Sequence, residues 1–250
     1  MRRTESIAIL AVLALAVSAL SLFGCRADNA AKEANQPDSG QTAPQAETPF
    51  PDPKTPATTI PATTINDKRP VIVCFGDSLT AGLGTEPGKS YPDYLQSDLD
   101  AKGYQYRVVN EGVSGNTTKD GLQRVDSIVA MKPAIVVVEF GGNDGLRGFR
   151  IEDSRANLDQ IVGTLKAAGA KIVLAGITLP PNYGPDYIKQ FNDTYVLLAK
   201  KYNSPMLPFL LKDVYGVDGM MQADNTHATS EGNKVVARNI LPLLLPLLKK

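Results

Sequence analysis

Residues 71–79 read VIVCFGDSL, an apolar run that ends in a Gly-Asp-Ser turn. A short apolar run bounded by turn residues is typical of a buried strand. The turn taken alone is ordinary, because Gly tolerates positive φ and both Asp and Ser bond to nearby backbone groups. The stretch therefore predicts a strand whose end presents Ser78 at a polar turn.

The same strand-like pattern recurs along the chain and alternates with amphipathic segments of helix length, which predicts a parallel sheet covered by helices. Pro242 and Pro246 should kink or end the last of these helices. Strands are expected over residues 71–75, 106–110, 134–139 and 171–177, with a short one near 206, and helices over 90–102, 119–131, 154–168, 187–201 and 230–248.

The chain has a single histidine, His227, three residues after Asp224. A lone histidine is usually a surface or core residue, and Asp-x-x-His often occurs by chance. Two further polar turns follow predicted strands, NEGVSGN at 110–116 and GGND at 141–144. Because the ligand crevice of an open parallel sheet lies beyond the carboxyl ends of its strands, these turns should meet Ser78 there. Together they favour a hydrolytic serine site.

Four ordered blocks carry a resemblance to a known family: GDSLTAG at 76–82, SGN at 114–116, GGND at 141–144 and DNTH at 224–227. The chain resembles the SGNH, or GDSL, hydrolases over residues 70–250, and among them the bacterial acyl thioesterase, lysophospholipase and arylesterase type. This family commonly has Pro after the histidine, where this chain has Ala228. The resemblance implies a flavodoxin-like three-layer α/β/α sandwich with a five-stranded parallel sheet.

The resemblance also implies residue roles. Ser78 would be the nucleophile, His227 the general base, and Asp224 the acid that orients the base. The oxyanion hole would comprise the N–H groups of Ser78 and Gly115 and the side-chain amide of Asn143. Asp77 and Asp144 are expected to brace loops by accepting N–H bonds. We expect no cofactor and no metal, because one His without a free Cys pair is a poor zinc ligand set.

Charge and composition limit the partners. The 26 acidic and 26 basic residues balance, so no strong field attracts nucleic acid. A monomer is expected, acting on a small acyl ester or a lysophospholipid.

The N-terminal segment has the pattern of an export signal, with Arg2 and Arg3 before an apolar stretch from 7 to 22. LFGC at 22–25 resembles a lipobox, which implies a signal peptide over 1–24 and a lipidated Cys25. An uncleaved membrane anchor is the alternative, since the uncharged stretch is just long enough to span a bilayer. Both alternatives place the protein on a membrane of the cell envelope, facing the periplasm or the exterior.

Residues 25–69 then comprise the lipidated Cys25 and a linker rich in Pro, Thr and Ala that is expected not to fold, and 70–250 the hydrolase domain. With Cys25 lipidated, Cys74 should be a lone buried thiol and no disulfide follows.

The expected function is hydrolysis of acyl esters or thioesters through an acyl-enzyme. Two alternatives remain open: a carbohydrate O-deacetylase, which the absence of Trp disfavours although Tyr183 and Tyr187 could stack on a sugar, and a non-catalytic envelope lipoprotein. The loops at 145–151 and 178–186 should shape the acyl groove.

Overall fold

A computed structural model describes residues 67–250, so the predicted signal peptide, Cys25 and nearly all of the linker lie outside the described residues. The core of the domain is a five-stranded parallel sheet, as expected, and its strand order is β2-β1-β3-β4-β5. Its strands are β1 (Val71–Gly76), β2 (Arg107–Gly112), β3 (Ile135–Glu139), β4 (Lys171–Ala175) and β5 (Met206–Leu207).

The two central strands, β1 and β3, are buried along their whole length. Both faces of a parallel sheet are covered, so a central strand is apolar at nearly every position rather than at alternate ones. This explains the continuous run VIVCF, in which Cys74 is a fully buried free thiol as predicted.

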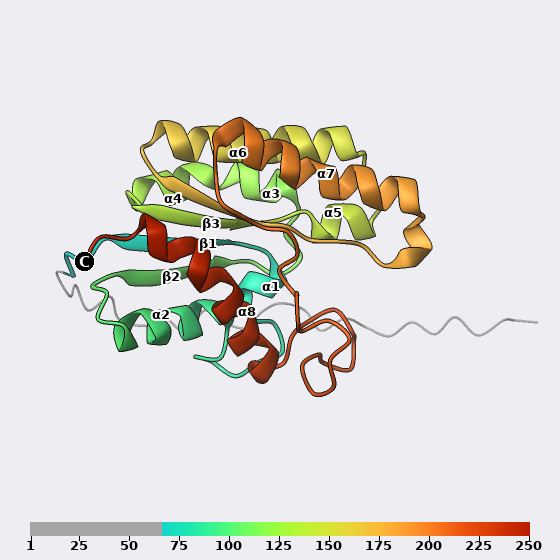
Figure 1. The fold of residues 1–250 in the computed structure, drawn as a ribbon. Helices are drawn as coiled ribbons and strands as arrows, with labels where there is room; N and C mark the ends of the chain where they lie inside the picture. The colour runs from blue at the N-terminus through green and yellow to red at the C-terminus, as the bar shows by residue number, and fades with distance from the viewer. Residues whose placement is uncertain (1–66) are drawn as a thin grey trace, which may run out of the picture. The chain divides into compact units, whose positions relative to one another are not determined.

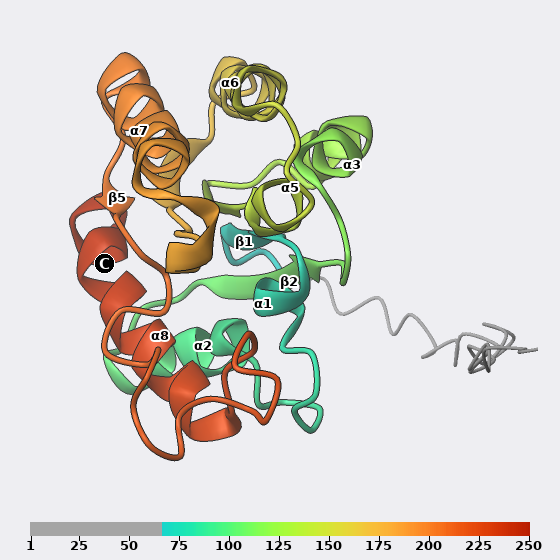
Figure 2. The same ribbon diagram turned by 90° about the vertical axis from the view of Figure 1, so that its right-hand side faces the viewer.

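Helices cover both faces of the sheet and complete the three-layer sandwich (Figure 1). Figure 2 views the sheet from the carboxyl ends of its strands, with one layer of helices below it and a larger layer above. The lower pair is α2 (Tyr91–Ala101) and α8 (Ser230–Leu244), and the upper layer comprises α3 (Thr118–Gln123), α4 (Val125–Ala130), α5 (Gly142–Leu146), α6 (Ile151–Ala167) and α7 (Pro185–Tyr202).

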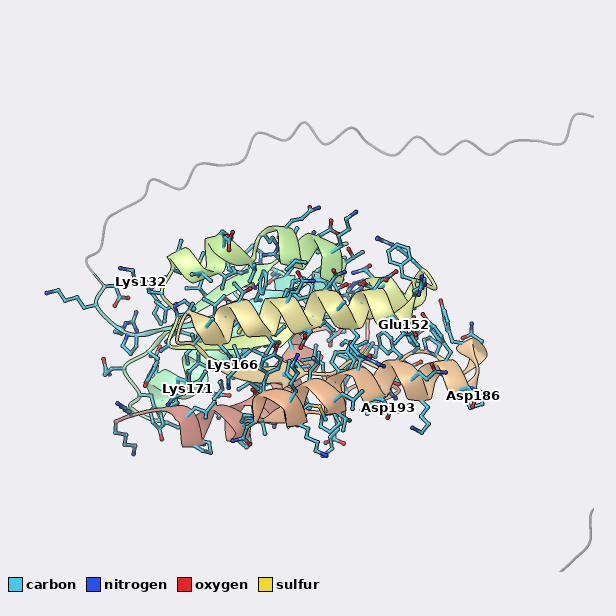
Figure 3. The ribbon with its side chains drawn as sticks, turned by 90° about the horizontal axis from the view of Figure 1, so that it is seen from above. Lys132, Glu152, Lys166, Lys171, Asp186 and Asp193 are labelled. Carbon is cyan, nitrogen blue, oxygen red and sulfur yellow. The ribbon has the colours of Figure 1, made fainter. Side chains whose placement is uncertain are left out.

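Helices α6 and α7 run side by side in the same direction, as Figure 3 shows. Glu152 lies in the first turn of α6 and Lys166 in its last, while α7 has Asp186 in its first turn and two lysines in its last. Acidic residues at the start and basic residues at the end of a helix complement its dipole. The charged residues therefore stabilise each helix in the direction it takes.

The predicted single helix over 119–131 is wrong. Arg124 has φ −113° and ψ 8° and divides the segment into α3 and α4. Its guanidinium lies 4.4 Å from the centre of the Phe75 ring and donates a 2.8 Å hydrogen bond to the carbonyl of Gly76. The helix is interrupted where the Arg124 side chain reaches the end of β1.

The last predicted helix ends early, as its prolines indicated. Helix α8 contains Pro242, stops at Leu244 and continues only as a 3₁₀ turn, η2 (Leu245–Leu247). Strand β2 extends two residues beyond the prediction, to Gly112, and β4 ends two residues before it, at Ala175.

Candidate active site

The polar turns at the ends of β1, β2 and β3 meet at one edge of the sheet. Strand order reverses there, because β2 lies on one side of β1 and β3 on the other. Ser78 is the first residue of the short helix α1 (Ser78–Ala81), and Asn143 lies in α5. Ser78, Gly115, Asn143 and His227 all line one cavity, so the fold brings together the residues predicted from the sequence.

Ser78, His227 and Asp224 form a continuous hydrogen-bonded chain. The Nε2 atom of His227 lies 2.8 Å from Oγ of Ser78, and its Nδ1 atom lies 2.6 Å from Oδ2 of Asp224. Desolvation opposes ionisation of Asp224, but hydrogen bonds from the His227 side chain and backbone outweigh it and lower the pKa of Asp224 to about 2. The carboxylate is therefore charged at neutral pH and can hold a proton on the ring.

A tight turn between β1 and α1 presents the Ser78 hydroxyl. Asp77 caps α1 by accepting the Leu79 N–H at 3.0 Å. Gly76 has no room for a side chain, because an added Cβ would collide with the Thr80 hydroxyl and the carbonyl of Glu139. A glycine is therefore required directly before the Asp-Ser pair.

A buried pair of carboxyl groups, Asp77 and Glu139, underlies this turn. Oε2 of Glu139 accepts hydrogen bonds from the Asp77 N–H at 3.2 Å and the Thr80 hydroxyl at 2.8 Å. Burial raises the pKa of Asp77 to about 6. Burial and the neighbouring Asp77 raise the pKa of Glu139 well above its usual range, which favours its neutral form.

Sequence reasoning missed Glu139. The available signal was its residue type, since it is a carboxyl residue that ends a strand otherwise made of Ile and Val.

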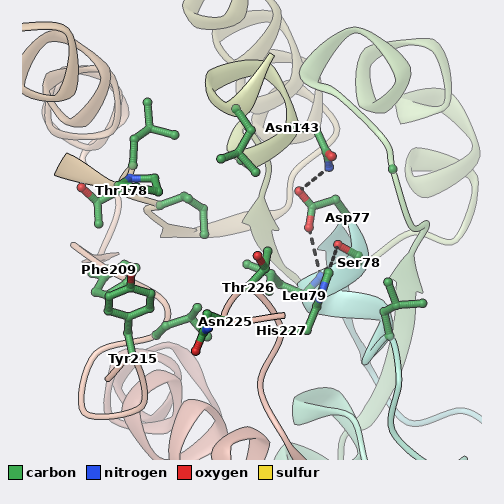
Figure 4. A pocket seen from close by; sticks show the side chains of 18 of the residues that line it. Asp77, Ser78, Leu79, Asn143, Thr178, Phe209, Tyr215, Asn225, Thr226 and His227 are labelled. Carbon is green, nitrogen blue, oxygen red and sulfur yellow. Dashed lines mark hydrogen bonds between the residues drawn. The ribbon is translucent and has the colours of Figure 1, made fainter. Parts of the chain in front are cut away.

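The predicted oxyanion donors line the same cavity as the Ser78 hydroxyl. Gly115 has φ +82°, which favours glycine, and the position where a Cβ would lie is open space. The Nδ2 atom of Asn143 donates to the carbonyl of Asn116 at 3.0 Å. It also donates to Oδ2 of Asp77 at 3.2 Å (Figure 4). Two acceptors thus fix the orientation of the Asn143 amide.

Asp77 and Asp144 brace loops, as predicted. Asp77 accepts the Leu79 N–H, and Asp144 accepts the Thr118 N–H at 2.9 Å and the Ser154 hydroxyl at 3.0 Å. Asp144 thereby ties the segment after β3 to α3 and α6.

An apolar cavity of about 570 Å³ opens beside Ser78. Figure 4 shows Ser78 and His227 on one side of it and Phe209 and Tyr215 on the other. The predicted groove loops contribute only in part, and the segment after β5 was missed because its sequence shows no periodic pattern. The apolar lining comprises Leu79, Leu83, Leu146, Ile177, Leu179, Pro180, Pro181, Phe209, Leu211 and Tyr215.

Tyr183 and Tyr187 lie outside the cavity lining and bond to the end of α5 and the segment after it. Their rings stack on each other, with 6.3 Å between the ring centres. The hydroxyl of Tyr183 donates to the carbonyl of Leu146 at 2.8 Å, and that of Tyr187 to the carbonyl of Phe149 at 2.9 Å. These bonds join the segment after β3 to the start of α7.

Two features are absent from residues 67–250. No group of three or more His, Cys, Asp or Glu side chains in this part could hold a metal ion. No helix in it is both long and apolar enough to cross a membrane.

Comparison with known proteins identifies the class that this fold and site define. Residues 74–235 match the GDSL-like lipase/acylhydrolase family. The chain belongs to that family, and it is a serine hydrolase of ester or thioester bonds of the SGNH type.

Named relatives share most of the domain. Esterase TesA of Pseudomonas aeruginosa is 43% identical over 178 residues, which are 71% of this chain and 89% of the relative. The thioesterase 1/protease 1/lysophospholipase L1 of Escherichia coli is 37% identical over 177 residues, 70% of this chain and 84% of that protein.

Solved structures agree with the sequence matches. A crystal structure of TesA matches at 43% identity with a TM-score of 0.69, covering 71% of this chain and 99% of that one. The psychrotrophic esterase EstA from Pseudoalteromonas sp., inhibited by monoethylphosphonate, matches at 30% identity with a TM-score of 0.66, covering 70% of this chain and 96% of that one.

Proposed function

We propose that this enzyme hydrolyses acyl esters and thioesters, including those of lysophospholipids, through an acyl-enzyme on Ser78. One observation carries the proposal: the Ser78–His227–Asp224 chain, with contacts of 2.8 Å and 2.6 Å, stands at the wall of an apolar cavity. A serine alone is a weak nucleophile, and an adjacent base oriented by a third group activates it.

The reaction then has two balanced halves. Ser78 Oγ bonds to the acyl carbon while its proton moves to Nε2 of His227, and the tetrahedral intermediate collapses when His227 returns this proton to the leaving alcohol or thiol. Water next attacks the acyl-enzyme, again losing a proton to His227. Collapse of the second intermediate releases the carboxylic acid and restores the Ser78 hydroxyl.

The developing oxyanion needs donors that are already oriented. The N–H groups of Ser78 and Gly115 make no hydrogen bond to another residue within 67–250 and are available for this role. Asn143 Nδ2 is held by Asn116 and, over a longer 3.2 Å contact, by Asp77. We expect the oxyanion to replace the longer of these two contacts in the transition state.

The cavity favours an acyl chain as the bound group. Its volume of about 570 Å³ lies within the range of small-ligand sites, and its lining is mainly Leu, Ile, Pro and aromatic residues. An acetylated sugar would leave its hydroxyls facing this apolar wall without partners, at an energetic cost. The names of the relatives, esterase and thioesterase/lysophospholipase, support acyl substrates in the same way.

We also propose, from the sequence alone, that lipid on Cys25 anchors the enzyme to an envelope membrane and that the domain acts as an exported monomer. The lipobox-like LFGC at 22–25 supports the anchor. An enzyme in that position would meet lysophospholipids where they form.

Replacing the nucleophile tests the function. Ser78→Ala should lower kcat by about 10⁶ for a p-nitrophenyl ester and for lysophospholipid, while the circular dichroism spectrum stays unchanged. A fluorophosphonate should label the parent enzyme once, at Ser78, and should not label the variant. Substantial activity of a folded Ser78→Ala enzyme would exclude this mechanism, and activity restricted to acetylated sugars would favour deacetylation.

A further inference from the structure

The loop that carries Asp224 and His227 is poorly supported by packing. Residues 223–226 are all exposed, and the next buried side chain is Ala228. The loop closes through a bridge between Met221 and Ala228 and a 2.8 Å hydrogen bond from the Gln222 N–H to the carbonyl of His227. Met221 and Ala228 pack at the base of the loop, but residues 223–226 add no buried side chain, so hydrogen bonds contribute to the position of His227 relative to Ser78.

The side chain of Gln222 supplies such bonds on both sides of the site. Its Nε2 atom donates to the carbonyl of Leu83 at 2.7 Å and to the carbonyl of Ala228 at 2.8 Å. Leu83 belongs to the nucleophile turn, since its own N–H bonds to the Ser78 carbonyl at 3.1 Å. Ala228 directly follows His227. One amide nitrogen thus links the segment of the nucleophile to the segment of the base.

The absence of a side chain at Gly84 leaves space for the Gln222 side chain. Gly84 has φ +76°, and an added Cβ would collide with Oε1 of Gln222. Within the described residues, two hydrogen bonds join residues 219–229 to residues 78–85. One is the bond between His227 and Ser78, and the other is the bond between Gln222 and Leu83. Gln222 does not line the cavity, so it acts on the site through backbone position.

We propose that Gln222 is a positioning residue that sets the distance between His227 and Ser78. The inference rests on the proposed roles of those two residues. A displacement of about 1 Å in an active site can cost about 10²-fold in rate. Loss of the bridge should therefore slow proton transfer between Ser78 and His227 without altering the acyl cavity.

Gln222→Met tests the proposal, because Met keeps the length of the side chain and removes both donors. We expect kcat for p-nitrophenyl butyrate to fall about 10–100-fold with KM within about twofold, as for a contact that matters in the transition state. The rate of inactivation by a fluorophosphonate should fall by the same factor as kcat. A second variant, Gln222→Glu, keeps Oε1 and replaces the Nε2 donor with a second oxygen. It should show the same loss of kcat.

Gln96→Met is the matched control. The Nε2 atom of Gln96 also bridges two acceptors, Oδ1 of Asp100 at 2.9 Å and the carbonyl of Tyr106 at 3.1 Å. Tyr106 precedes β2 and so lies at the opposite edge of the sheet from Ser78. This variant should lose thermal stability without losing kcat.

Three results would overturn the inference: an unchanged kcat in both Gln222 variants, a rise in KM alone, or an equal loss of kcat in Gln96→Met. If Gln222→Met does not fold, the kcat and KM of Gln222→Glu test the inference. Ser78→Ala separates this inference from the proposed function. An inactive Ser78→Ala with fully active Gln222 variants would refute only the positioning role.

Discussion

In the proposed mechanism, Asn143 serves both the resting enzyme and the transition state. Its amide is held by Asn116 and Asp77 before substrate arrives, so its direction is fixed in advance. Asn143→Ala should lower kcat by about 10²–10³ with little change in KM, because the contact strengthens only as negative charge develops. Steady-state kinetics with a p-nitrophenyl ester check this. A higher KM with unchanged kcat would instead assign Asn143 to substrate binding.

The buried Asp77 should leave a signature in the pH dependence of stability. Its pKa is about 6 in the folded protein, against about 4 in an unfolded chain, so the folded state holds the proton more tightly. The free energy of unfolding should therefore fall as the pH rises from 4 through 6. Urea unfolding across this range should show a flatter profile for Asp77→Asn.

Asp120 provides a control of opposite sign. Hydrogen bonds from the Thr117 backbone and hydroxyl lower the pKa of Asp120, so its contribution is present above its unfolded pKa and is lost as the pH falls through its folded value. The free energy of unfolding of the parent enzyme should therefore fall as the pH becomes acidic, and this fall should be smaller in Asp120→Asn. Identical profiles for Asp77→Asn and the parent enzyme would show that Asp77 does not hold a raised pKa.

Sequence analysis found the residues that lie in recognisable motifs and missed those that act through long-range contacts. Ser78, Gly115, Asn143 and His227 line one cavity, as predicted. Glu139 bonds to a residue 62 positions away, and Gln222 to one 139 positions away. No local pattern encodes such partners, because only the folded chain brings them together.

At the scale of secondary structure, the pattern of apolar residues in the sequence predicted the strands better than it predicted the helices. Strands β1 and β3 follow directly from their apolar runs. The short helices α1 and α5 escaped prediction because each has fewer residues than two helical turns and so shows no periodicity. The break at Arg124 also escaped, since its cause is a contact with the end of β1.

Arg124 therefore offers a test of how a helix break supports the site. Arg124→Ala leaves the Gly76 carbonyl and Oδ1 of Asn116, which accept its bonds at 2.8 Å each, without these donors. We expect the free energy of unfolding to fall by about 1–3 kcal/mol. Arg150→Ala is the control, because Arg150 is exposed and should change stability by less than about 0.5 kcal/mol. Equal urea midpoints for both variants would contradict the structural role of Arg124.

At the scale of the described domain, the fold places the first and last described residues away from the proposed catalytic residues. In Figure 1, the described chain begins at the end of the sheet opposite α1 and α5, and its C-terminus lies at that same end. The α/β/α class followed from the alternation of strands and helices, because each strand had to be covered on both faces. The shape of the acyl cavity could not be predicted in this way, since it depends on how separate loops pack around Ser78.

This separation leads to a prediction about the proposed anchor. Every group that we assign to catalysis lies within residues 67–250, so a lipid on Cys25 should contribute location and not rate. Cys25→Ser should move the enzyme from the membrane to the soluble fraction, abolish labelling by radioactive palmitate, and leave kcat/KM for a soluble ester unchanged. Cys74→Ser is the control, because Cys74 is the other cysteine of the chain and is buried in β1. If Cys25→Ser stays with the membrane, the uncleaved anchor is the correct alternative, and a changed kcat/KM would place part of the catalytic machinery before residue 67.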